Sequence, residues 1–244
     1  PLSEPLPPPS PAPDKGRQVR AMFAGIAHRY DLLNHLLSLG TDIRWRRAAV
    51  RRWASRLPAG RPELLDLCCG TGDLARLMAR FGPVTGCDFC LPMLARGRDK
   101  LRRRAHRGHA IRLAAGDALE LPFPDGCFDG LMVAFGVRNF ADVDAGLREM
   151  RRVLRPGGVA GILEFSQPTL PVFRPLFLFY FHRVLPALGR LVSGRGGAYR
   201  YLPESVAAFP DTPTFAAQLE AAGFRDVVWR RYTCGVAALH VARR

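Results

Sequence analysis

Long hydrophobic runs are absent from this sequence, and so is the apolar segment of a secretory signal. None of its 244 residues belongs to a stretch of 18 or more consecutive apolar residues, so we expect no membrane-spanning helix. Seven of the first fourteen residues are proline, which predicts a disordered proline-rich tail over residues 1–16 and argues against a secretory leader. Residues 17–244 are expected to form a single domain with one substantial core.

Lysine is scarce as well. Only Lys15 and Lys100 are lysine among 36 basic residues, so arginine carries the net charge of +15. The arginines concentrate between Arg44 and Arg61 and between Arg96 and Arg112. We interpret these stretches as solvated helix faces, with an anionic membrane surface and a polynucleotide as the alternatives.

A second cysteine pair, of the kind that completes a zinc site, is missing. Cys87 and Cys90 form a single C-x-x-C without a nearby histidine, so we expect no bound metal. The six cysteines lie mostly in apolar strand patterns, which is typical of reduced, buried thiols in a cytoplasmic protein.

Over residues 64–74 a buried strand breaks into a glycine turn and then opens a helix. Gly70 and Gly72 leave out side chains where the backbone turns sharply and approaches a ligand. The dinucleotide fingerprint G-x-G-x-x-G is incomplete, because Ala75 stands at its third glycine position. Asp73 adds a negative charge at the helix start, where it would repel a diphosphate. The ligand is therefore expected to be cationic or neutral at this point.

Strand and helix patterns alternate regularly from Glu63 onward, which predicts right-handed βαβ units and an α/β fold. We expect a Rossmann-like, doubly wound, mostly parallel sheet. The predicted strands are 64–67, 84–88, 111–115, 128–134, 159–163, 227–232 and 236–242. Two apolar stripes at helical spacing within residues 17–60 predict N-terminal helices that cover the mouth of the site. A last helix is predicted to begin at Pro213, with Thr212 as its cap.

Three acids, Asp66, Asp88 and Asp117, belong to the ends of three successive predicted strands. Ligands of doubly wound sheets bind at the carboxyl ends of the strands. Asp88, 22 residues after Asp66, is placed to accept hydrogen bonds from two ribose hydroxyls, and Asp117 with Ala118 is placed to bind an adenine edge. A single acid of this kind is usually a turn former or a helix cap, but three in register favour a nucleoside site.

Longer blocks of sequence carry a resemblance to known families. Residues 65–75, 86–88 and 121–129 resemble class I S-adenosylmethionine-dependent methyltransferases. More narrowly, the chain from about Met22 onward resembles the ubiquinone/menaquinone biosynthesis C-methyltransferase family. The blocks are F-G-V-R-N at 135–139, R-V-L-R-P-G-G at 152–158, L-E-F-S at 163–166, Y-R-Y-L-P-E-S at 199–205 and A-A-G-F at 221–224. The resemblance implies a seven-stranded sheet closed by an antiparallel C-terminal strand pair.

The same resemblance implies S-adenosyl-L-methionine as the cofactor. Asp73 then suits the ligand, because this cofactor carries an ammonium group and a sulfonium. Cys90 and Ala134 stand where the family often has serine, which removes two hydroxyl contacts and leaves the backbone carbonyls. The implied cofactor residues are Thr71, Asp88, Asp117, Ala118 and Ala134, with Gly70 and Gly72 shaping the loop and Asp66 and Asp73 facing the amino-acid end.

The implied reaction is C-methylation of the ring of a polyprenylated quinol, either demethylmenaquinol or the equivalent ubiquinone precursor. The ring carbon becomes nucleophilic when a neighbouring hydroxyl loses its proton. The implied catalytic residues are Arg138, Asn139 and Tyr30. Because the pKa of arginine lies above about 12, we expect Arg138 to stabilise the phenolate and to orient a water, with Asn139 as hydrogen-bond partner, instead of acting as a free base.

An apolar insertion at residues 165–204, not required by the bare fold, contains the aromatic run 176–181. This apolar run is too short to cross a bilayer, so we interpret the insertion as a buried cap helix or as a surface offered to lipid. A polyprenyl tail suits both interpretations. With the arginine stretches, the insertion favours a cytoplasmic protein in peripheral contact with the anionic inner face of a membrane, and a homodimer is compatible with the sequence.

Other function classes stay open. A methyltransferase of RNA would explain the charge, but residues 134–137 lack the Asn/Asp-Pro-Pro-aromatic block of amino-methylating enzymes, and the chain has no Pro-Cys. We therefore expect no specific nucleic-acid partner. Another small aromatic acceptor is a further alternative. A non-catalytic cofactor-binding protein would be favoured by a broken glycine loop or by the loss of Arg138 and Asn139, and neither is seen.

Overall fold

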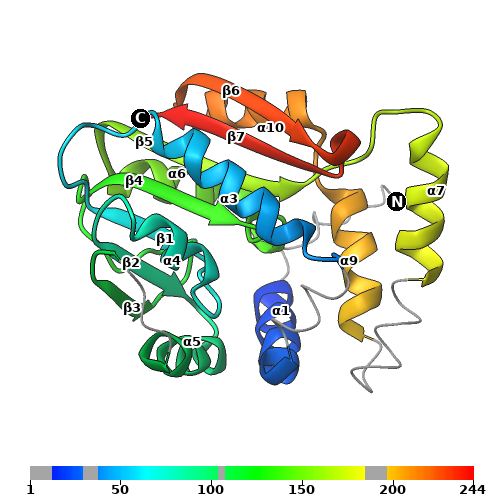
Figure 1. Cartoon of the computed structure of the whole chain (residues 1–244), viewed down its shortest axis with the longest axis horizontal. Coiled ribbons are helices and arrows are strands. Elements are labelled where there is room, and N and C mark those ends of the chain that lie inside the picture. Colours follow the sequence, from blue (N-terminus) through cyan, green and yellow to red (C-terminus); the bar gives the residue numbers. More distant parts are fainter. Residues whose placement is uncertain (1–12, 30–37, 104–107, 185–196) are drawn as a thin grey trace, which may run out of the picture.

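The computed structural model describes residues 13–29, 38–103, 108–184 and 197–244. Within them, seven strands form one sheet in the order β3-β2-β1-β4-β5-β7-β6 (Figure 1). The strands are β1 Leu64–Leu67, β2 Val84–Asp88, β3 Ile111–Ala115, β4 Phe128–Ala134, β5 Leu154–Phe165, β6 Arg225–Tyr232 and β7 Ala237–Arg243. Strands β1 to β5 run parallel, whereas β7 pairs antiparallel with both β5 and β6. The predicted α/β fold with its antiparallel carboxyl-terminal pair is confirmed.

The central strands are covered on both faces. All four residues of β1 are buried, as are most residues of β4, and their sequences are nearly continuous apolar runs. This is the pattern of a parallel strand with helices packed on either side. Asp66 is the exception, since it places a carboxyl group inside the buried strand β1.

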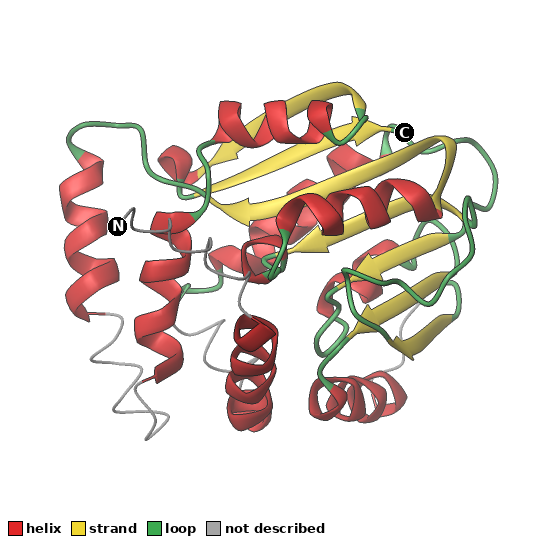
Figure 2. Cartoon of the chain, turned by 180° about the vertical axis from the view of Figure 1, so that it is seen from behind, coloured by secondary structure: helices red, strands yellow, loops and turns green. Residues whose placement is uncertain are grey.

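Helices supply the two layers that cover the sheet. Helices α3 Thr41–Ala54 and α4 Asp73–Met78 pack on one face, and α6 Val143–Val153 and α10 Thr212–Ala221 pack on the other, which is turned toward the viewer in Figure 2. The apolar residues of α6, Leu147, Met150 and Val153, recur at helical spacing on its sheet-facing side. Asp142 caps this helix, because its carboxylate accepts a hydrogen bond from the N–H of Ala145 at 2.9 Å.

Trp53 anchors α3 on the middle of the sheet. Its side chain is fully buried, and the indole Nε1 donates to the carbonyl of Val159 on β5 at 3.0 Å. Glycines make room for the ring: a Cβ added at Gly161 would lie 2.8 Å from Trp53 Cδ1, and one at Gly130 would lie 2.6 Å from Trp53 Cζ2. The prediction that α3 covers the mouth of the site was therefore wrong, because its two tryptophans hold it on the face of the sheet.

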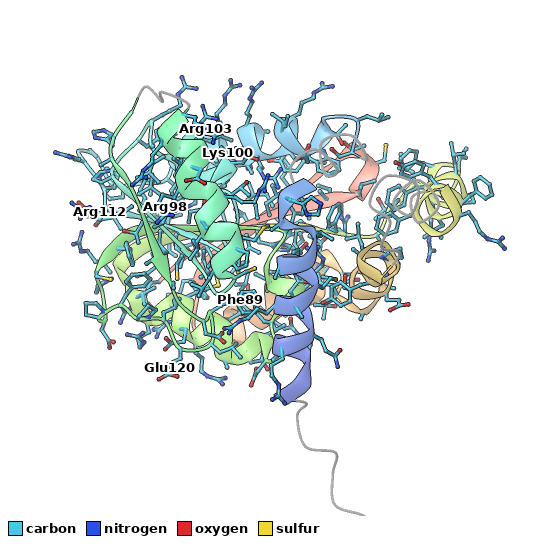
Figure 3. The ribbon with its side chains drawn as sticks, turned by 90° about the horizontal axis from the view of Figure 1, so that it is seen from below. Phe89, Arg98, Lys100, Arg103, Arg112 and Glu120 are labelled. Carbon is cyan, nitrogen blue, oxygen red and sulfur yellow. The ribbon has the colours of Figure 1, made fainter. Side chains whose placement is uncertain are left out.

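Helices α1 Pro13–Ile26, α9 Gly197–Ala208 and α7 Phe173–Phe179 gather at the edge where the parallel strands end, whereas α5 Leu91–Arg103 lies alongside β2 and β3 (Figure 1). Helix α1 packs against both α5 and α9, and it lies between them when the molecule is seen from below (Figure 3). Helix α7 stands beside α9 (Figure 1). In the described part of the chain, no helix is long and apolar enough to cross a membrane.

Three boundaries differ from the sequence prediction. Helix α1 begins at Pro13, inside the predicted tail 1–16, of which residues 1–12 lie outside the described residues. Strand β5 begins at Leu154, because Leu154 pairs with Phe128 ahead of a register shift. The cap of α10 is Asp211, whose carboxylate accepts from the N–H of Thr214 at 2.9 Å, so the assignment to Thr212 was wrong. Thr212 is buried, and its hydroxyl lies within 3.3 Å of the Ser166 hydroxyl.

The Trp53 contact predicts a stability effect. Gly161→Ala should lower the free energy of unfolding by about 1–3 kcal/mol, because the added methyl overlaps a fully buried indole ring that has no space to retreat. Chemical denaturation of both proteins measures the change. Gly16→Ala is the control, since a Cβ there would meet no atom within 4 Å. A Gly161→Ala protein as stable as the parent would show that Trp53 is not tightly packed.

Candidate active site

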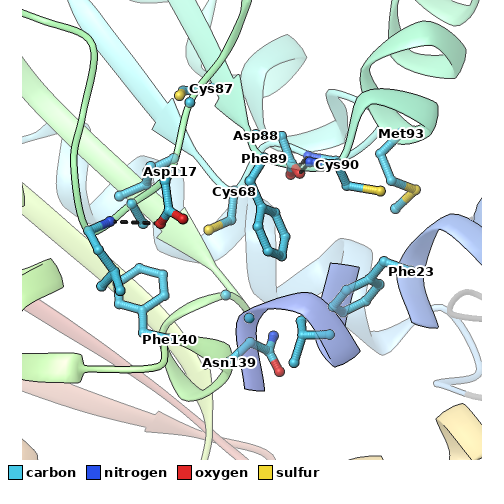
Figure 4. A pocket seen from close by; sticks show the side chains of 18 of the residues that line it. Phe23, Cys68, Cys87, Asp88, Phe89, Cys90, Met93, Asp117, Asn139 and Phe140 are labelled. Atoms are coloured by element: carbon cyan, nitrogen blue, oxygen red, sulfur yellow. Dashed lines mark hydrogen bonds between the residues drawn. The ribbon is translucent and has the colours of Figure 1, made fainter. Parts of the chain in front are cut away.

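A pocket opens at the carboxyl ends of β1, β2 and β4, where the expected ligand site lies (Figure 4). Its empty volume, open mouth included, is about 800 Å³, which suits a nucleoside-sized ligand. Six of the sequence-predicted residues line it, namely Gly70, Asp88, Asp117, Ala118, Ala134 and Asn139. The structure thus brings together residues from four separate strand ends.

Asp88 ties the glycine turn to the end of β2. Its carboxylate accepts from the N–H of Gly70 and from the N–H of Cys90, both at 2.8 Å. Gly70 and Gly72 have φ values of 55° and 83°, in the left-handed region that glycine adopts without strain, so both form the sharp turn that the sequence predicts. Burial raises the pKa of the Asp88 carboxyl, and the hydrogen bonds from Cys90 and Gly70 partly oppose this rise. Its remaining lone pairs are available to hydroxyl donors in the pocket.

The opposite wall is built around the end of β3. Asp117 is exposed, and its carboxylate accepts from the N–H of Leu119 at 3.0 Å, which holds the turn in shape (Figure 4). Ala118 is buried beneath the turn. The backbone of Gly116 is tightly packed against neighbouring side chains. A Cβ added there would lie 2.6 Å from Pro122 Cδ and 2.8 Å from Cys87 Sγ. Ala118, Leu119 and Phe89 give the pocket part of its apolar lining.

The remaining acids and Thr71 lie behind the pocket wall. The Asp66 carboxyl is fully buried and has no charged or side-chain hydrogen-bond partner in the described part of the chain; burial raises its pKa well above the ordinary value, and the backbone N–H of Ala75 partly opposes this rise. Asp73 forms an ion pair with Lys100 at 2.7 Å, and the Lys100 ammonium also donates to the hydroxyl of Thr71 at 3.1 Å. The charge that the sequence offers at Asp73 is therefore already compensated by a lysine.

Residues 135–140, which follow β4, form a further side of the pocket, and we call this stretch the acceptor loop after the role that the sequence resemblance implies for it. Phe135 has φ of 63°, a strained value for a side chain of its size, and the short 3-10 helix Val137–Asn139 follows. The Arg138 guanidinium is buried and donates through Nη1 to Glu164 Oε1 at 2.8 Å and to the Phe135 carbonyl at 2.6 Å. Its Nε finds no acceptor among the described residues. Arg138 thus carries one buried donor that protein atoms in this part of the chain do not use, but its side chain lies behind the pocket wall and does not line the pocket.

Asn139 contributes the polar side chain of this loop that faces the pocket. Its Nδ2 donates to the Phe135 carbonyl at 3.3 Å, and its Oδ1 accepts from the hydroxyl of Tyr201 on α9 at 3.0 Å. Tyr30, the third predicted catalytic residue, lies outside the described residues. Tyr201 and Glu164 were missed as site residues, although both belong to the blocks Y-R-Y-L-P-E-S and L-E-F-S that carried the resemblance.

Helix α1 closes the pocket from the remaining side. Gly16, Val19 and Phe23 line the pocket, so the predicted helical cover is present in α1. The Lys15 ammonium donates to the carbonyls of Phe140 at 2.6 Å and Arg138 at 3.3 Å, which fastens the helix to the acceptor loop. In the sequence, Lys15 stands out only because lysine is rare in this arginine-rich chain, and no pattern there indicates its partners.

Comparison with known proteins agrees with this geometry. Residues 13–244 match the ubiE/COQ5 methyltransferase family. The chain belongs to this family. It is 51% identical to a demethylmenaquinone methyltransferase of Thermus thermophilus, over 91% of this chain and all of that protein. It is also 46% identical to a ubiquinone/menaquinone biosynthesis C-methyltransferase UbiE of Geobacter sulfurreducens, over 95% of this chain and 90% of that protein. A demethylmenaquinone methyltransferase of Deinococcus radiodurans is 46% identical over 98% of both chains. The protein is thus an S-adenosyl-L-methionine-dependent C-methyltransferase of menaquinone or ubiquinone biosynthesis.

Solved structures agree on the fold of this methyltransferase. The [4+2]-cyclase SpnF superposes with a TM-score of 0.66 at 18% identity, covering 94% of this chain and 96% of that one. A methyltransferase of Thermotoga maritima superposes with a TM-score of 0.62 at 16% identity, covering 91% of this chain and 98% of that one. Since one of the two is a cyclase, the fold by itself does not define the reaction.

The pocket of this methyltransferase fits S-adenosyl-L-methionine. Asp88 has lone pairs that suit ribose hydroxyls, and the apolar lining of Ala118 and Leu119 suits the adenine, whereas Asp66 does not line the pocket. Cys68, Cys87 and Cys90 also line the pocket, and burial raises the pKa of each thiol, that of Cys87 to about 12. They therefore stay protonated near neutral pH and do not compete as nucleophiles for the methyl group.

The role of Asp88 predicts a loss of cofactor affinity. Asp88→Asn should raise the Kd for S-adenosyl-L-methionine about 10- to 100-fold, since charge-assisted hydrogen bonds are lost. Because burial raises the pKa of Asp88, the parent should also bind more weakly as the pH falls and the carboxyl protonates, whereas Asp88→Asn should lack this component. Titration calorimetry across pH measures both effects. Asp99→Asn, an exposed change on α5, is the control, and unchanged affinity in Asp88→Asn would contradict the assignment.

Proposed function

We propose that this enzyme methylates a ring carbon of a polyprenylated quinol, demethylmenaquinol or its ubiquinone-pathway counterpart. The observation that supports this most directly is the pair of amide and guanidinium donors, Asn139 and Arg138, on the loop that borders the cofactor pocket. Relatives at 46–51% identity are named demethylmenaquinone methyltransferases, which supports the same class of acceptor.

The chemistry requires a stabilised phenolate next to the methyl donor. When bound, S-adenosyl-L-methionine supplies an electrophilic methyl group. The acceptor carbon becomes a nucleophile as the neighbouring hydroxyl loses its proton, so donors aimed at that oxygen lower the barrier. We assign this task to the unused Nε–H of Arg138 and to the Asn139 amide, with a water beside Arg138 carrying the proton away. Tyr30 stays part of the proposed catalytic set.

Glu164 keeps Arg138 in place. Its carboxylate is 2% exposed and binds both the guanidinium Nη1 at 2.8 Å and the Arg138 backbone N–H at 3.3 Å. The ring of Phe165 lies 5.2 Å from the guanidinium carbon and flanks the pair. A buried charge pair of this kind has a fixed geometry, so the Nε–H keeps its direction while the acceptor enters and leaves.

The acceptor class predicts the outcome of a methylation assay. Purified protein with labelled S-adenosyl-L-methionine should transfer label to reduced demethylmenaquinone or to a 2-polyprenyl-6-methoxy-benzoquinol, and not to total RNA. Label in RNA alone would overturn the quinol assignment. The two quinols are assayed separately, so that the rates of label transfer show which headgroup the enzyme prefers.

Two variants of Arg138 act as controls in the same assay. Arg138→Ala should retain cofactor affinity and lose turnover about 100-fold or more, as expected when a donor to a developing oxyanion is removed. Because this change leaves Glu164 buried without its partner, Arg138→Met with Glu164→Gln removes both charges and should restore stability without restoring turnover. Full turnover in either variant would remove Arg138 from the mechanism.

We also propose that the insertion meets the membrane. On its inner side Phe177 and Phe181 stack, with ring centroids 5.0 Å apart, and pack against Phe165. On its outer side Leu170, Val172, Leu176 and Phe179 are 51–90% exposed, and we call these four residues the α7 apolar edge. Together with the net charge of +15, such an edge suits an anionic lipid surface, from which a polyprenyl tail would enter.

The α7 apolar edge predicts lipid binding. Val172→Asp with Phe179→Asp should abolish cosedimentation with phosphatidylglycerol vesicles and raise the KM for a long-chain quinol, while turnover of a short-chain quinol stays unchanged. Leu91→Asp is the matched control, since Leu91 is 63% exposed on α5, a helix on the other side of α1 from α7 (Figure 3). Unaltered vesicle binding in the double variant would sink the proposal.

A further inference from the structure

The carboxamide of Asn139 is held at both of its ends. Its Nδ2 donates to the Phe135 carbonyl, and its Oδ1 accepts from the hydroxyl of Tyr201. The Phe135 carbonyl also accepts from Arg138, so the two proposed catalytic side chains share one acceptor. Tyr201 is 62 residues away from Asn139 in the sequence and belongs to the cap insertion, whereas the other partners belong to the strand-end loop.

These partners determine which end of the amide faces which way. A carbonyl can only accept, so the Asn139 nitrogen must be the atom beside Phe135, and the oxygen must be the atom beside Tyr201. The reverse orientation would place two oxygens against each other. The nitrogen carries two hydrogens, of which one is used by Phe135, and Figure 4 shows it on the pocket side of the amide. The second N–H is therefore available to an oxygen atom in the pocket.

Tyr201 has the properties that this role requires. Its side chain is half-buried, and burial raises the pKa of its phenol, so it stays protonated and remains a hydrogen-bond donor at physiological pH. Helix α9, which carries it, packs against α1 and against the 3-10 helix 137–139. The hydroxyl therefore reaches Asn139 from a rigid element and not from a surface loop.

We propose that Tyr201 is a positioning residue for methyl transfer, whose hydroxyl keeps the Asn139 amide turned with its N–H toward the oxygen of the acceptor. This rests on the proposed function, in which that oxygen becomes a phenolate. The same hydrogen bond links the cap insertion to the reaction. While α9 stays packed on the acceptor loop, Tyr201 keeps the Asn139 N–H directed at the oxygen of the acceptor during methyl transfer.

Tyr201→Phe tests the role, since it removes only the hydroxyl. We expect kcat to fall about tenfold, the loss of one hydrogen bond in the transition state, while the KM for S-adenosyl-L-methionine and the melting temperature stay unchanged. Tyr232→Phe, which removes a hydroxyl from a half-buried tyrosine on β6, is the matched control and should leave kcat unchanged. A Tyr201→Phe enzyme with full kcat would overturn the proposal.

A double-mutant cycle separates positioning from a structural role. If Tyr201 acts through Asn139, then Tyr201→Phe should cause no further loss of kcat in an Asn139→Ala background. Equal losses in both backgrounds would overturn the proposal, even where the single variant is slow. The cycle uses whichever acceptor the parent enzyme methylates, so a parent that is inactive on quinols contradicts the proposed function and leaves the positioning role to be decided on the other acceptor.

Discussion

The carboxyl ends of β1, β2, β3 and β4 meet at one edge because these strands run parallel and in register. Leu67, Cys87 and Val133 are direct neighbours across three strands, so the residues that follow each strand enter the same small volume. Asp88, Asp117 and Asn139 are brought together by this constraint alone, although the segments that carry them are far apart in the chain. Every other feature of the active site is attached to this edge.

Most acidic side chains at this edge of the sheet have a positively charged or hydrogen-bonding partner. Glu164 is bound by Arg138, Asp73 by Lys100, and Asp88 by two backbone N–H groups. A buried carboxylate without such partners is costly, so these contacts allow acids to lie beside a pocket with largely apolar walls. Asp66 is the acid of this group without a side-chain or charged partner in the described ranges, and burial raises its pKa well above the ordinary value, which favours its neutral form.

The segments outside the parallel sheet complete the site by packing on the acceptor loop from two sides. Helix α1 reaches it through Lys15 and Helix α9 through Tyr201, and both contacts end on the stretch Phe135–Phe140. This loop begins with the strained backbone of Phe135, which the surrounding contacts maintain. The cofactor side of the pocket and its acceptor side are therefore built differently, the first from strand ends and the second from helices docked onto one loop.

The sequence by itself determined the strands, the glycine turn and the acids that follow the strands, because hydrophobic periodicity and glycine spacing are local properties. Six predicted site residues line one pocket for that reason. Only the tertiary structure decided that Arg138 pairs with Glu164, that Asn139 is held by Tyr201 and that Lys15 fastens α1. These partners are 26, 62 and 125 residues apart, and contacts over such separations depend on how whole helices pack, which no local pattern encodes.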